Sequence, residues 1–232
     1  MVIRAILAGQ TQTTELIEIP LLSIILVTVF LIASRRSQIQ KELEFKNAEL
    51  QQALDERNAL QEALSLQAFY DPLTRLPNRV LFYDRLRHAL ARTARHHGIV
   101  AVLFLDLDGF KSVNDRFGHT HGDQLLIQVA ERMQLQMRTE DTLARLGGDE
   151  FTVLLANETS IGGATQVARR LLDEISLPYM IDGEKVTLSA SIGVAVNASE
   201  NMQPDDLIRN ADNAMYQAKT SGKASFKVFT LN

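Results

Sequence analysis

Hydrophobic and polar positions divide the chain into three zones with different patterns. In the first zone, residues 19–34 form a run of sixteen uncharged residues dominated by Leu, Ile, Val and Phe. As a helix this run covers roughly 24 Å, and Leu16 and Ile17 can extend it toward the hydrocarbon thickness of about 30 Å. We predict an N-terminal arm and a single transmembrane helix within residues 1–34. A buried core helix and a signal peptide are the alternatives, but the run shows no amphipathic stripe and no clear cleavage site follows it.

Charged residues on either side of the run predict its orientation. Lys and Arg that flank a membrane helix collect on its cytoplasmic side. Acidic residues precede the run and basic residues follow it: Glu15 and Glu18 before, and Arg35, Arg36, Lys41 and Lys46 after. The C-terminal bulk is therefore expected in the cytoplasm, and the N-terminal arm is too short for a sensory domain on the other side.

The second zone, residues 35–67, has the pattern of a coiled coil. It contains no Gly or Pro and is rich in Gln, Glu, Leu and Ala. One core position recurs every seven residues, at Leu43, Leu50, Arg57 and Leu64. The alternate core position is filled by Ile39, Ala53 and Leu60, with Lys46 and Gln67 as interruptions. These heptads predict a short parallel coiled coil; a solvated helix that packs on its own domain is the alternative.

The third zone, residues 68–232, alternates short apolar runs with amphipathic segments. Asp-Pro and Pro-Asn pairs at residues 71–72 and 77–78 are turn signals at its start. We predict strands at residues 100–107, at two segments within 142–155, at 186–196 and at 226–229. We predict helices at residues 122–137, 161–175 and 204–220. This alternation predicts an α/β (α+β) domain in which helices cover one central sheet.

Composition excludes several kinds of chemistry. Of the 232 residues, 46% are apolar and 22% are charged, so wholesale disorder is excluded. The absence of cysteine removes disulfides, cysteine zinc sites and thiol nucleophiles. The net charge of −4 argues against a strongly basic interface, and we expect no nucleic-acid partner.

Two carboxylates stand at the end of the first predicted strand. Asp106 and Asp108 are two residues apart, so their side chains are expected on the same face, and Gly109 then turns the chain toward Lys111. Oxygen ligands at a strand end suit a divalent cation such as Mg²⁺, which keeps waters and substrate phosphates as its other ligands. Amides of the turn and the Lys111 ammonium can then receive phosphate. An exposed turn with ordinary capping carboxylates is the alternative.

A second acidic turn joins two of the predicted strands. Gly147 and Gly148 permit a tight hairpin that a ligand can approach closely. Asp149 and Glu150 follow directly, and two adjacent acids are costly without a cation nearby. Together with Asp106 they could complete a site for one or two metals, which activates a hydroxyl and stabilises a leaving oxygen. A solvent-exposed acidic hairpin is the alternative.

Residues 145–151, Arg-Leu-Gly-Gly-Asp-Glu-Phe, resemble the signature of GGDEF-domain diguanylate cyclases. The resemblance covers the whole third zone through motifs that occur in matching order and spacing. These are Asp-Pro-Leu-Thr-Arg-Leu-Pro-Asn-Arg at 71–79, Phe-Leu-Asp-Leu-Asp-Gly-Phe-Lys at 104–111, Asn-Asp at 114–115, Phe-Gly-His at 117–119, Gly-Asp at 122–123, Ser-Ile-Gly-Val-Ala at 191–195 and Ala-Asp-Asn-Ala-Met-Tyr-Gln-Ala-Lys at 211–219. One pentapeptide alone would be moderate support, whereas the complete series is specific for the family.

The resemblance implies an activity, a fold and a cofactor. Members of this family join two GTP molecules into cyclic di-GMP and release two pyrophosphates. Their fold is similar to class III nucleotidyl cyclases and to the palm of polymerases. By this resemblance Asp106 and Asp149 ligate Mg²⁺ (or Mn²⁺), and the carbonyl of Leu107 assists. Glu150 joins the metal site or helps to deprotonate the ribose 3′-hydroxyl.

The same resemblance implies the substrate contacts. Asn114 and Asp123 would bind the guanine edge, which suits an amide and a carboxylate acceptor; helix capping and turn formation are the alternative. The other expected substrate-binding residues are Phe110, Lys111, Lys219 and Lys223 around the phosphates, with Gly147 and Gly148 in the turn. The expected catalytic residues are Glu150, Asp149 and Lys111. Lys223 stands where arginine is common in the family, which weakens bidentate phosphate contact but keeps the charge.

The implied chemistry requires two copies of the domain. Each 3′-hydroxyl must attack the α-phosphate of the other GTP, so two half-sites must face each other across a two-fold axis. The predicted coiled coil would raise the effective concentration of the second half-site. We therefore expect a homodimer.

A candidate control site precedes the acidic turn. Arg138 and Asp141 match the spacing of the inhibitory site at which members of the family bind cyclic di-GMP, and Arg169 is a further candidate there. A surface ion pair is the alternative for this Arg-x-x-Asp match.

The sequence therefore predicts a product-inhibited diguanylate cyclase of the bacterial inner (cytoplasmic) membrane, with a catalytic domain at residues 68–232. A catalytically silent module that binds GTP or cyclic di-GMP is the alternative, and an enzyme that makes another cyclic dinucleotide is a third hypothesis.

Overall fold

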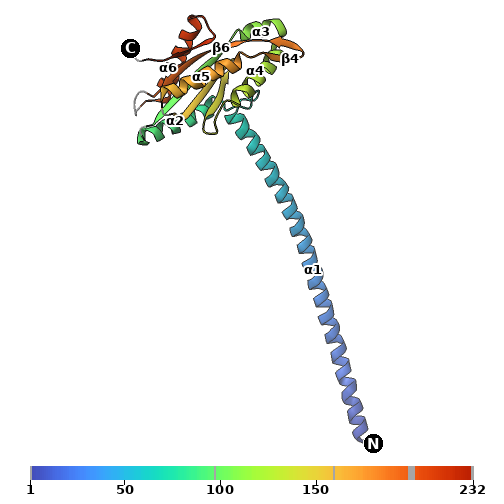
Figure 1. Ribbon diagram of the computed structural model, residues 1–232. Helices are drawn as coiled ribbons and strands as arrows, with labels where there is room; N and C mark the ends of the chain where they lie inside the picture. The colour runs from blue at the N-terminus through green and yellow to red at the C-terminus, as the bar shows by residue number, and fades with distance from the viewer. Residues whose placement is uncertain (1, 97, 159, 198–201, 231–232) are drawn as a thin grey trace. The chain divides into compact units, whose positions relative to one another are not determined.

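The computed structural model describes residues 2–96, 98–158, 160–197 and 202–230, and Figure 1 shows their elements. The chain divides into two compact units, Met1–Ala63 and Leu64–Asn232. Each unit is described by itself below.

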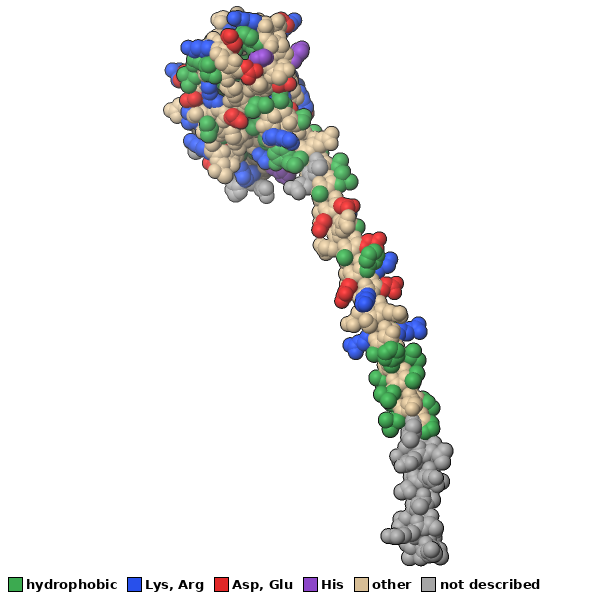
Figure 2. Space-filling model, turned by 90° about the vertical axis from the view of Figure 1, so that its right-hand side faces the viewer, with side chains coloured by type: hydrophobic (Ala, Val, Ile, Leu, Met, Phe, Trp, Pro, Cys, Tyr) green, Lys and Arg blue, Asp and Glu red, His purple; other side chains and the backbone are tan. Residues whose placement is uncertain are grey.

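A single helix, α1 (Val2–Phe69), makes up the described part of the first unit. From residue 21 to its end the helix contains no Gly or Pro, so nothing in the sequence interrupts it. The large apolar side chains described on it are exposed, and the face shown in Figure 2 carries a band of them followed by charged side chains. Within the described residues, α1 is the one helix long and apolar enough to cross a membrane, with a mean hydropathy of 1.6 over its most apolar window.

A five-stranded sheet forms the centre of the second unit. Its strands are β1 (Ile99–Asp108), β2 (Thr142–Gly147), β3 (Glu150–Glu158), β6 (Ser189–Val196) and β7 (Ser225–Val228). Their order across the sheet is β2-β3-β1-β6-β7, and all neighbours are antiparallel except β6 and β7. The central position of β1 explains its nearly continuous apolar sequence, because both of its faces are covered.

Helices cover both faces of this sheet. The helices α2 (Arg79–His96) and α6 (Pro204–Thr220) pack on one face. The other face carries α3 (Phe110–Phe117), α4 (His119–Gln134) and α5 (Ile161–Ile175). A separate hairpin consists of β4 (Tyr179–Ile181) and β5 (Glu184–Val186). The predicted fold class, a mixed α/β domain with a central sheet covered by helices, is confirmed.

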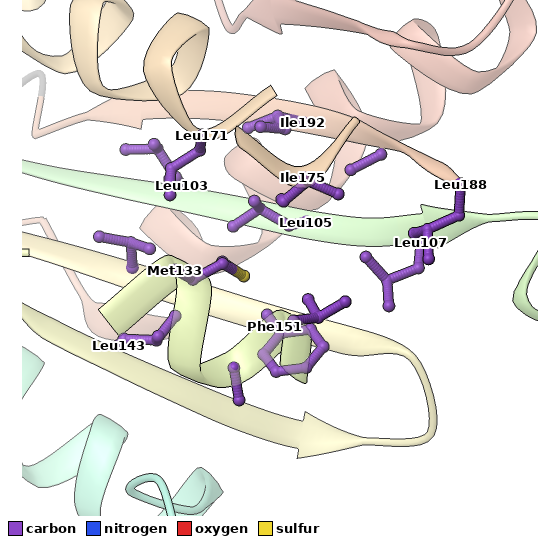
Figure 3. Close-up of a cluster of buried hydrophobic side chains, with 14 of the residues drawn as sticks. Leu103, Leu105, Leu107, Met133, Leu143, Phe151, Leu171, Ile175, Leu188 and Ile192 are labelled. Carbon is purple, nitrogen blue, oxygen red and sulfur yellow. The ribbon is translucent and has the colours of Figure 1, made fainter. Parts of the chain in front are cut away.

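The side chains of β1 alternate between two buried clusters. Leu103, Leu105 and Leu107 belong to the cluster beneath α4 and α5, part of which Figure 3 shows. Val102 and Phe104 belong to the cluster beneath α2 and α6. This period of two places Asp106 on the α6 side at the end of the strand.

The helix α6 lies unusually close to β6 because of one glycine. A Cβ atom on Gly193 would lie 1.9 Å from the carbonyl oxygen of Ala211 and 2.2 Å from the amide nitrogen of Met215. No larger residue fits there without movement of the helix. The contact fixes the position of α6 over the sheet, and with it that of Lys219 in the last turn of the helix.

Several predicted boundaries were wrong. The strand predicted at 186–196 is interrupted after β5, and α4 begins and ends about three residues before the predicted 122–137. The helix α2 was not predicted, although Phe82, Leu86 and Leu90 are buried at helical spacing. The helix α3 was not predicted either, because eight residues are too few to show a helical period.

Candidate active site

Antiparallel pairing brings the acidic turn to the end of β1. Asp106 is the register partner of Glu150, and the amide of Leu107 donates a hydrogen bond of 3.3 Å to the carbonyl oxygen of Asp149. Gly147 and Gly148 have positive φ values of 145° and 54°, which allow the tight turn between β2 and β3. Asp106, Asp149 and Glu150, which the sequence analysis grouped, therefore lie together.

Asp106 is buried and paired with a lysine. The Nζ atom of Lys219 lies 2.7 Å from Oδ2 of Asp106. Burial raises the pKa of Asp106, as do the charges of Asp149 and Asp108, while Lys219 acts in the opposite direction. One ammonium group therefore does not fully compensate the negative charge at this point.

Glu150 is affected by its acidic neighbours in the same way. Burial raises the pKa of Glu150, and the negative charges of Asp106, Asp149 and Asp212 add to the effect, against an opposing contribution from Arg79. A carboxyl group with a raised pKa is a better proton acceptor than an ordinary one.

The donor set at this point is chemically suited to a divalent cation, but its side chains do not converge. Within the described residues, no cluster of three or more His, Asp or Glu side chains is arranged to hold a metal ion. Carboxylates of like charge separate when no cation joins them, and Asp106 binds Lys219 instead. Two carboxylates and the Leu107 carbonyl supply only hard oxygen atoms, which are the ligands that Mg²⁺ and Mn²⁺ prefer.

Asp108 has a different environment from Asp106. Its carboxylate accepts hydrogen bonds from the hydroxyls of Ser189 and Ser191, both 2.9 Å, and from the amide of Ala224 at 3.1 Å. These contacts satisfy the carboxylate and tie β1 to β6 and to the turn after α6. Asp108 is therefore a structural residue of the strand end.

Asn114 and Asp123 come from two consecutive helices, α3 and α4. Asn114 Oδ1 is buried and, within the described residues, has no hydrogen-bond partner. A Cβ atom on Gly122 would lie 1.8 Å from that oxygen and 3.3 Å from Cζ of Phe110. Gly122 therefore leaves the space that the Asn114 amide occupies, and a buried acceptor without a donor is suited to an N–H group of a ligand.

Three lysines expected at the phosphates come from different elements. Lys111 is exposed in the first turn of α3. This helix begins directly after Gly109, which has a φ of 84°. Lys219 is held on Asp106, and the exposed Lys223 lies in the following turn with a φ of 64°. The amides of the first turn of α3 and these cations are the groups available to bind phosphate.

Arg145 is a site residue that the sequence analysis quoted only as part of a motif. Its guanidinium donates to the Asp71 carboxylate at 2.9 and 3.2 Å and to the carbonyl oxygen of Gly148 at 2.7 and 3.0 Å. Burial acts to raise the pKa of Asp71, but hydrogen bonds from Thr74 and Arg145 outweigh it and lower the pKa. The sequence signal was a basic residue two positions before the Gly-Gly-Asp-Glu motif, but its partner is 74 positions away.

The loop that contains Asp71 also holds the last turn of α1. The Asn78 amide groups donate to the carbonyl oxygens of Phe69 and Ala68, both at 2.9 Å, and the amide of Arg145 donates to Pro77 at 3.0 Å. Backbone and side-chain hydrogen bonds thus join the end of α1 to the strand that carries the acidic turn.

Arg138 and Asp141 lie apart from these acids, in the turn between α4 and β2. Asp141 accepts a hydrogen bond of 3.0 Å from the Arg138 amide. Burial raises the pKa of Asp141, and the charges of Arg138 and Arg170 oppose this. Arg170 is thus the further arginine near Asp141, whereas Arg169 lies against the ring of Phe226.

A cavity of about 370 Å³ borders Asp141. Its polar lining includes Arg85, His88, Arg92 and Glu140.

Comparison with known proteins identifies the class to which this fold and site belong. The fold to be compared is a central sheet of order β2-β3-β1-β6-β7, in which Asp106 is paired with Glu150 of the acidic turn. Residues 68–225 match the family described as "Diguanylate cyclase, GGDEF domain". The chain belongs to the GGDEF family.

Named relatives support this assignment. The chain is 43% identical over 209 residues to the bifunctional diguanylate cyclase/cyclic di-GMP phosphodiesterase MucR of Pseudomonas aeruginosa, covering 90% of this chain and 30% of MucR. The solved GGDEF domain of TpbB from the same species is 42% identical with a TM-score of 0.68, over 70% of this chain and 95% of that one.

A second solved structure includes a coiled coil. The coiled coil and GGDEF domain of DgcB from Caulobacter crescentus, in complex with c-di-GMP, is 25% identical with a TM-score of 0.74, over 80% of this chain and 98% of that one. The chain spans less than half the length of the curated relatives MucR and TpbB.

Proposed function

We propose that this chain is a diguanylate cyclase that condenses two GTP molecules into cyclic di-GMP and two pyrophosphates. The observation that carries the proposal is the intact Gly-Gly-Asp-Glu turn, whose Glu150 is paired in register with the buried Asp106. The relatives named as diguanylate cyclases support the same reaction.

Different residues bind the guanine base and carry out the proton transfer. Asn114 and Asp123 bind the guanine edge, and Oδ1 of Asn114, which has no hydrogen-bond partner among the described residues, accepts an N–H of the base. Glu150 takes the proton of the ribose 3′-hydroxyl, and the raised pKa of this carboxyl suits it to that role. The 3′-oxygen then forms a bond to the α-phosphorus of the other GTP, and the bond to pyrophosphate breaks.

The remaining charged groups act on the phosphates. Asp106, Asp149 and the carbonyl of Leu107 would hold Mg²⁺ (or Mn²⁺), which, when bound, neutralises charge that develops on the phosphate oxygens. The phosphate contacts come from the turn at Gly147 and Gly148 and from the residues Phe110, Lys111, Lys219 and Lys223.

A second copy of the chain is the proposed partner, because each half-site holds one GTP. The apolar heptad side chains on α1 are exposed and unpartnered within the described residues, as in one strand of a parallel coiled coil. Pairing of two such helices brings the half-sites together at high effective concentration.

The apolar segment of α1 before Arg35 is the proposed anchor. It would cross the bacterial inner membrane once and leave the catalytic domain in the cytoplasm.

The Arg138 and Asp141 turn is the proposed site of inhibition by the product. Arg138 can bind a phosphate of cyclic di-GMP and stack on its guanine, while Asp141 accepts from the guanine edge. The nearby Arg170 supplies a further cation. If Arg138→Ala left the inhibition constant for cyclic di-GMP unchanged, this assignment would fail.

Incubation of the purified protein with GTP and Mg²⁺, followed by mass analysis, tests the proposed reaction. We expect cyclic di-GMP from the parent chain and none from Glu150→Ala. If the parent binds GTP or cyclic di-GMP but forms no product, the silent-module alternative is correct. A control with ATP in place of GTP tests the choice of base.

A further inference from the structure

The ammonium group of Lys219 is bound to the carboxylate that the proposed function assigns to the metal. Its Nζ atom lies 2.7 Å from Asp106 Oδ2, which is a charge-assisted hydrogen bond. Of the residues that the structure describes, Lys219 is the one cation in ion-pair contact with Asp106, Asp149 or Glu150.

The surroundings of Asp106 show why a counter-ion is needed. The Asp106 side chain is 13% exposed, and the negative charges of Asp149 and Asp108 act on it. A buried carboxylate among like charges is unfavourable unless a cation compensates it. Lys219 provides that cation from the last turn of α6, which the close contact at Gly193 holds over the sheet.

A metal ion on the same carboxylate would weaken this pairing. A Mg²⁺ ion lies roughly 2.0–2.1 Å from its oxygen ligands and imposes octahedral geometry on them. The ammonium group would then meet a divalent cation of like charge at close range. The Lys219 side chain is 31% exposed on a flexible four-carbon stem, so it is able to move away.

We propose that Lys219 is the counter-ion of Asp106 before the metal enters, and that the incoming cation displaces it toward the nucleotide phosphates. This inference rests on the proposed function, which supplies the metal and the phosphates. The Asp106 carboxylate then has a cationic partner at both stages, first an ammonium and afterwards a metal. Metal binding and triphosphate binding favour each other, because metal entry releases a phosphate ligand and phosphate holds that ligand away from Asp106.

If Lys219 competes with the metal for Asp106, its removal changes the metal affinity; if Lys219 only binds phosphate, its removal does not. A lysine that binds phosphate alone leaves metal affinity unchanged in the absence of nucleotide, apart from a long-range effect of its charge. A competing lysine weakens that affinity, so its removal strengthens metal binding while it harms turnover. Lys223 is a matched control, because it follows four residues later and forms no ion pair among the described residues.

Binding of Mn²⁺ to the nucleotide-free protein, measured by electron paramagnetic resonance, tests the proposal. We expect Lys219→Gln to bind Mn²⁺ roughly tenfold more tightly than the parent, because a charge-assisted hydrogen bond no longer has to be broken. Lys223→Gln should change the affinity less than twofold. Lys219→Arg keeps the competing cation and should resemble the parent, while Asp106→Asn should lose the bound Mn²⁺.

Equal Mn²⁺ affinities of Lys219→Gln and Lys223→Gln would overturn the proposal, and so would failure of the folded parent and Lys219→Gln to bind Mn²⁺. Thermal melting verifies that each variant is folded, and Lys219→Met removes the ammonium group equally if the glutamine variant is not. Synthesis of cyclic di-GMP by the parent is measured separately. If the parent makes cyclic di-GMP but Lys219→Gln and Lys223→Gln bind Mn²⁺ equally, only the counter-ion role of Lys219 is refuted. If their Mn²⁺ affinities differ but the parent makes no cyclic di-GMP, only the cyclase activity is refuted.

Discussion

Two charged clusters contact the turn between β2 and β3, and they are compensated in different ways. In the first, the Asp71 carboxylate receives hydrogen bonds from Thr74 and Arg145, and Arg145 also binds the carbonyl oxygen of Gly148. The second consists of Asp106, Asp149 and Glu150. Among the described residues its one ion-paired cation is the Lys219 ammonium, which contacts Asp106.

The pKa directions express the same difference. Although burial opposes it, the pKa of Asp71 is lowered by its donors, whereas burial and acidic neighbours raise the pKa values of Asp106 and Glu150. The fold therefore satisfies the charge that holds the turn in place and leaves negative charge uncompensated where a ligand is expected. The first cluster should govern stability and the second should govern activity.

Glu150→Gln gives the largest expected effect, because it removes a proposed proton acceptor and leaves the packing unchanged. We expect the rate of cyclic di-GMP formation to fall by roughly 10²–10⁴-fold. The melting temperature should stay equal or rise, since one of several like charges is removed. Turnover within threefold of the parent would place Glu150 outside the chemistry and contradict the division between the clusters.

Arg145→Met breaks the other cluster. Its side chain is 10% exposed and that of Asp71 15%, so the change leaves a largely buried carboxylate and the Gly148 carbonyl without their donor. We expect the free energy of unfolding in urea to fall by about 2–4 kcal/mol.

Arg87→Met is the matched control for this substitution, because the Arg87 and Asp84 side chains are 69% and 42% exposed. It should cost about 0.5 kcal/mol or less. Equal losses in the two variants would show that the Asp71 pairing is no stronger than a surface pair.

Sequence reasoning succeeded where the strand and turn patterns themselves predict which segments of the chain meet. Asp106, Asp149 and Glu150 could be grouped because an apolar strand and a Gly-Gly turn predict neighbouring strand ends. The pairing of Arg145 with Asp71 could not be predicted, because the two residues are far apart in the sequence. Only the folded loop after α1 brings them together. The contact between Lys219 and Asp106 depends in the same way on the packing of α6 against β6.

The fold shows the same limit at its shorter elements. Long periodic segments such as α5 and α6 were predicted to the residue, because a buried stripe repeats over several turns. The break between β5 and β6 was not predicted, because the apolar sequence continues through it. The local sequence pattern therefore predicted the long helices, while tertiary contacts determined where the shorter elements begin and end.

Asp108→Asn sharpens the comparison with a smaller effect. The strand pattern grouped Asp108 with Asp106, although the family resemblance implied a metal role for Asp106 alone of the two. Asp108 is satisfied by the Ser189 and Ser191 hydroxyls and the Ala224 amide, which places it with the structural charges. Asparagine keeps the shape but offers a donor where a carboxylate accepted three hydrogen bonds. We expect a loss of about 1–2 kcal/mol in urea unfolding, with turnover within a few-fold of the parent. If turnover fell as far as in Glu150→Gln, Asp108 would belong to the reactive cluster.

The pH dependence of stability gives the smallest expected effect and tests both clusters in one experiment. Asp71 has a lowered pKa in the folded state, so its stabilisation is complete above its unfolded value of about 3.9 and is lost as the pH falls through the folded value. Asp106 and Glu150 have raised pKa values, so the folded state retains protons longer than the unfolded state. The free energy of unfolding therefore falls as the pH rises through those values.

These opposite pH dependences predict a maximum in the free energy of unfolding, measured in urea from pH 3 to 8. The maximum should lie between the pH range in which Asp71 titrates and the range in which Asp106 and Glu150 titrate. Asp71→Asn should flatten the acidic side of the curve. Glu150→Gln should flatten the side toward neutral pH by about 0.5 kcal/mol or less, because the Glu150 side chain is partly exposed. A neutral-side slope that Glu150→Gln leaves unchanged would mean that the raised pKa of Glu150 does not contribute to stability. In that case the carboxylates would be compensated within the fold, and the contrast with Asp71 and Arg145 would be lost.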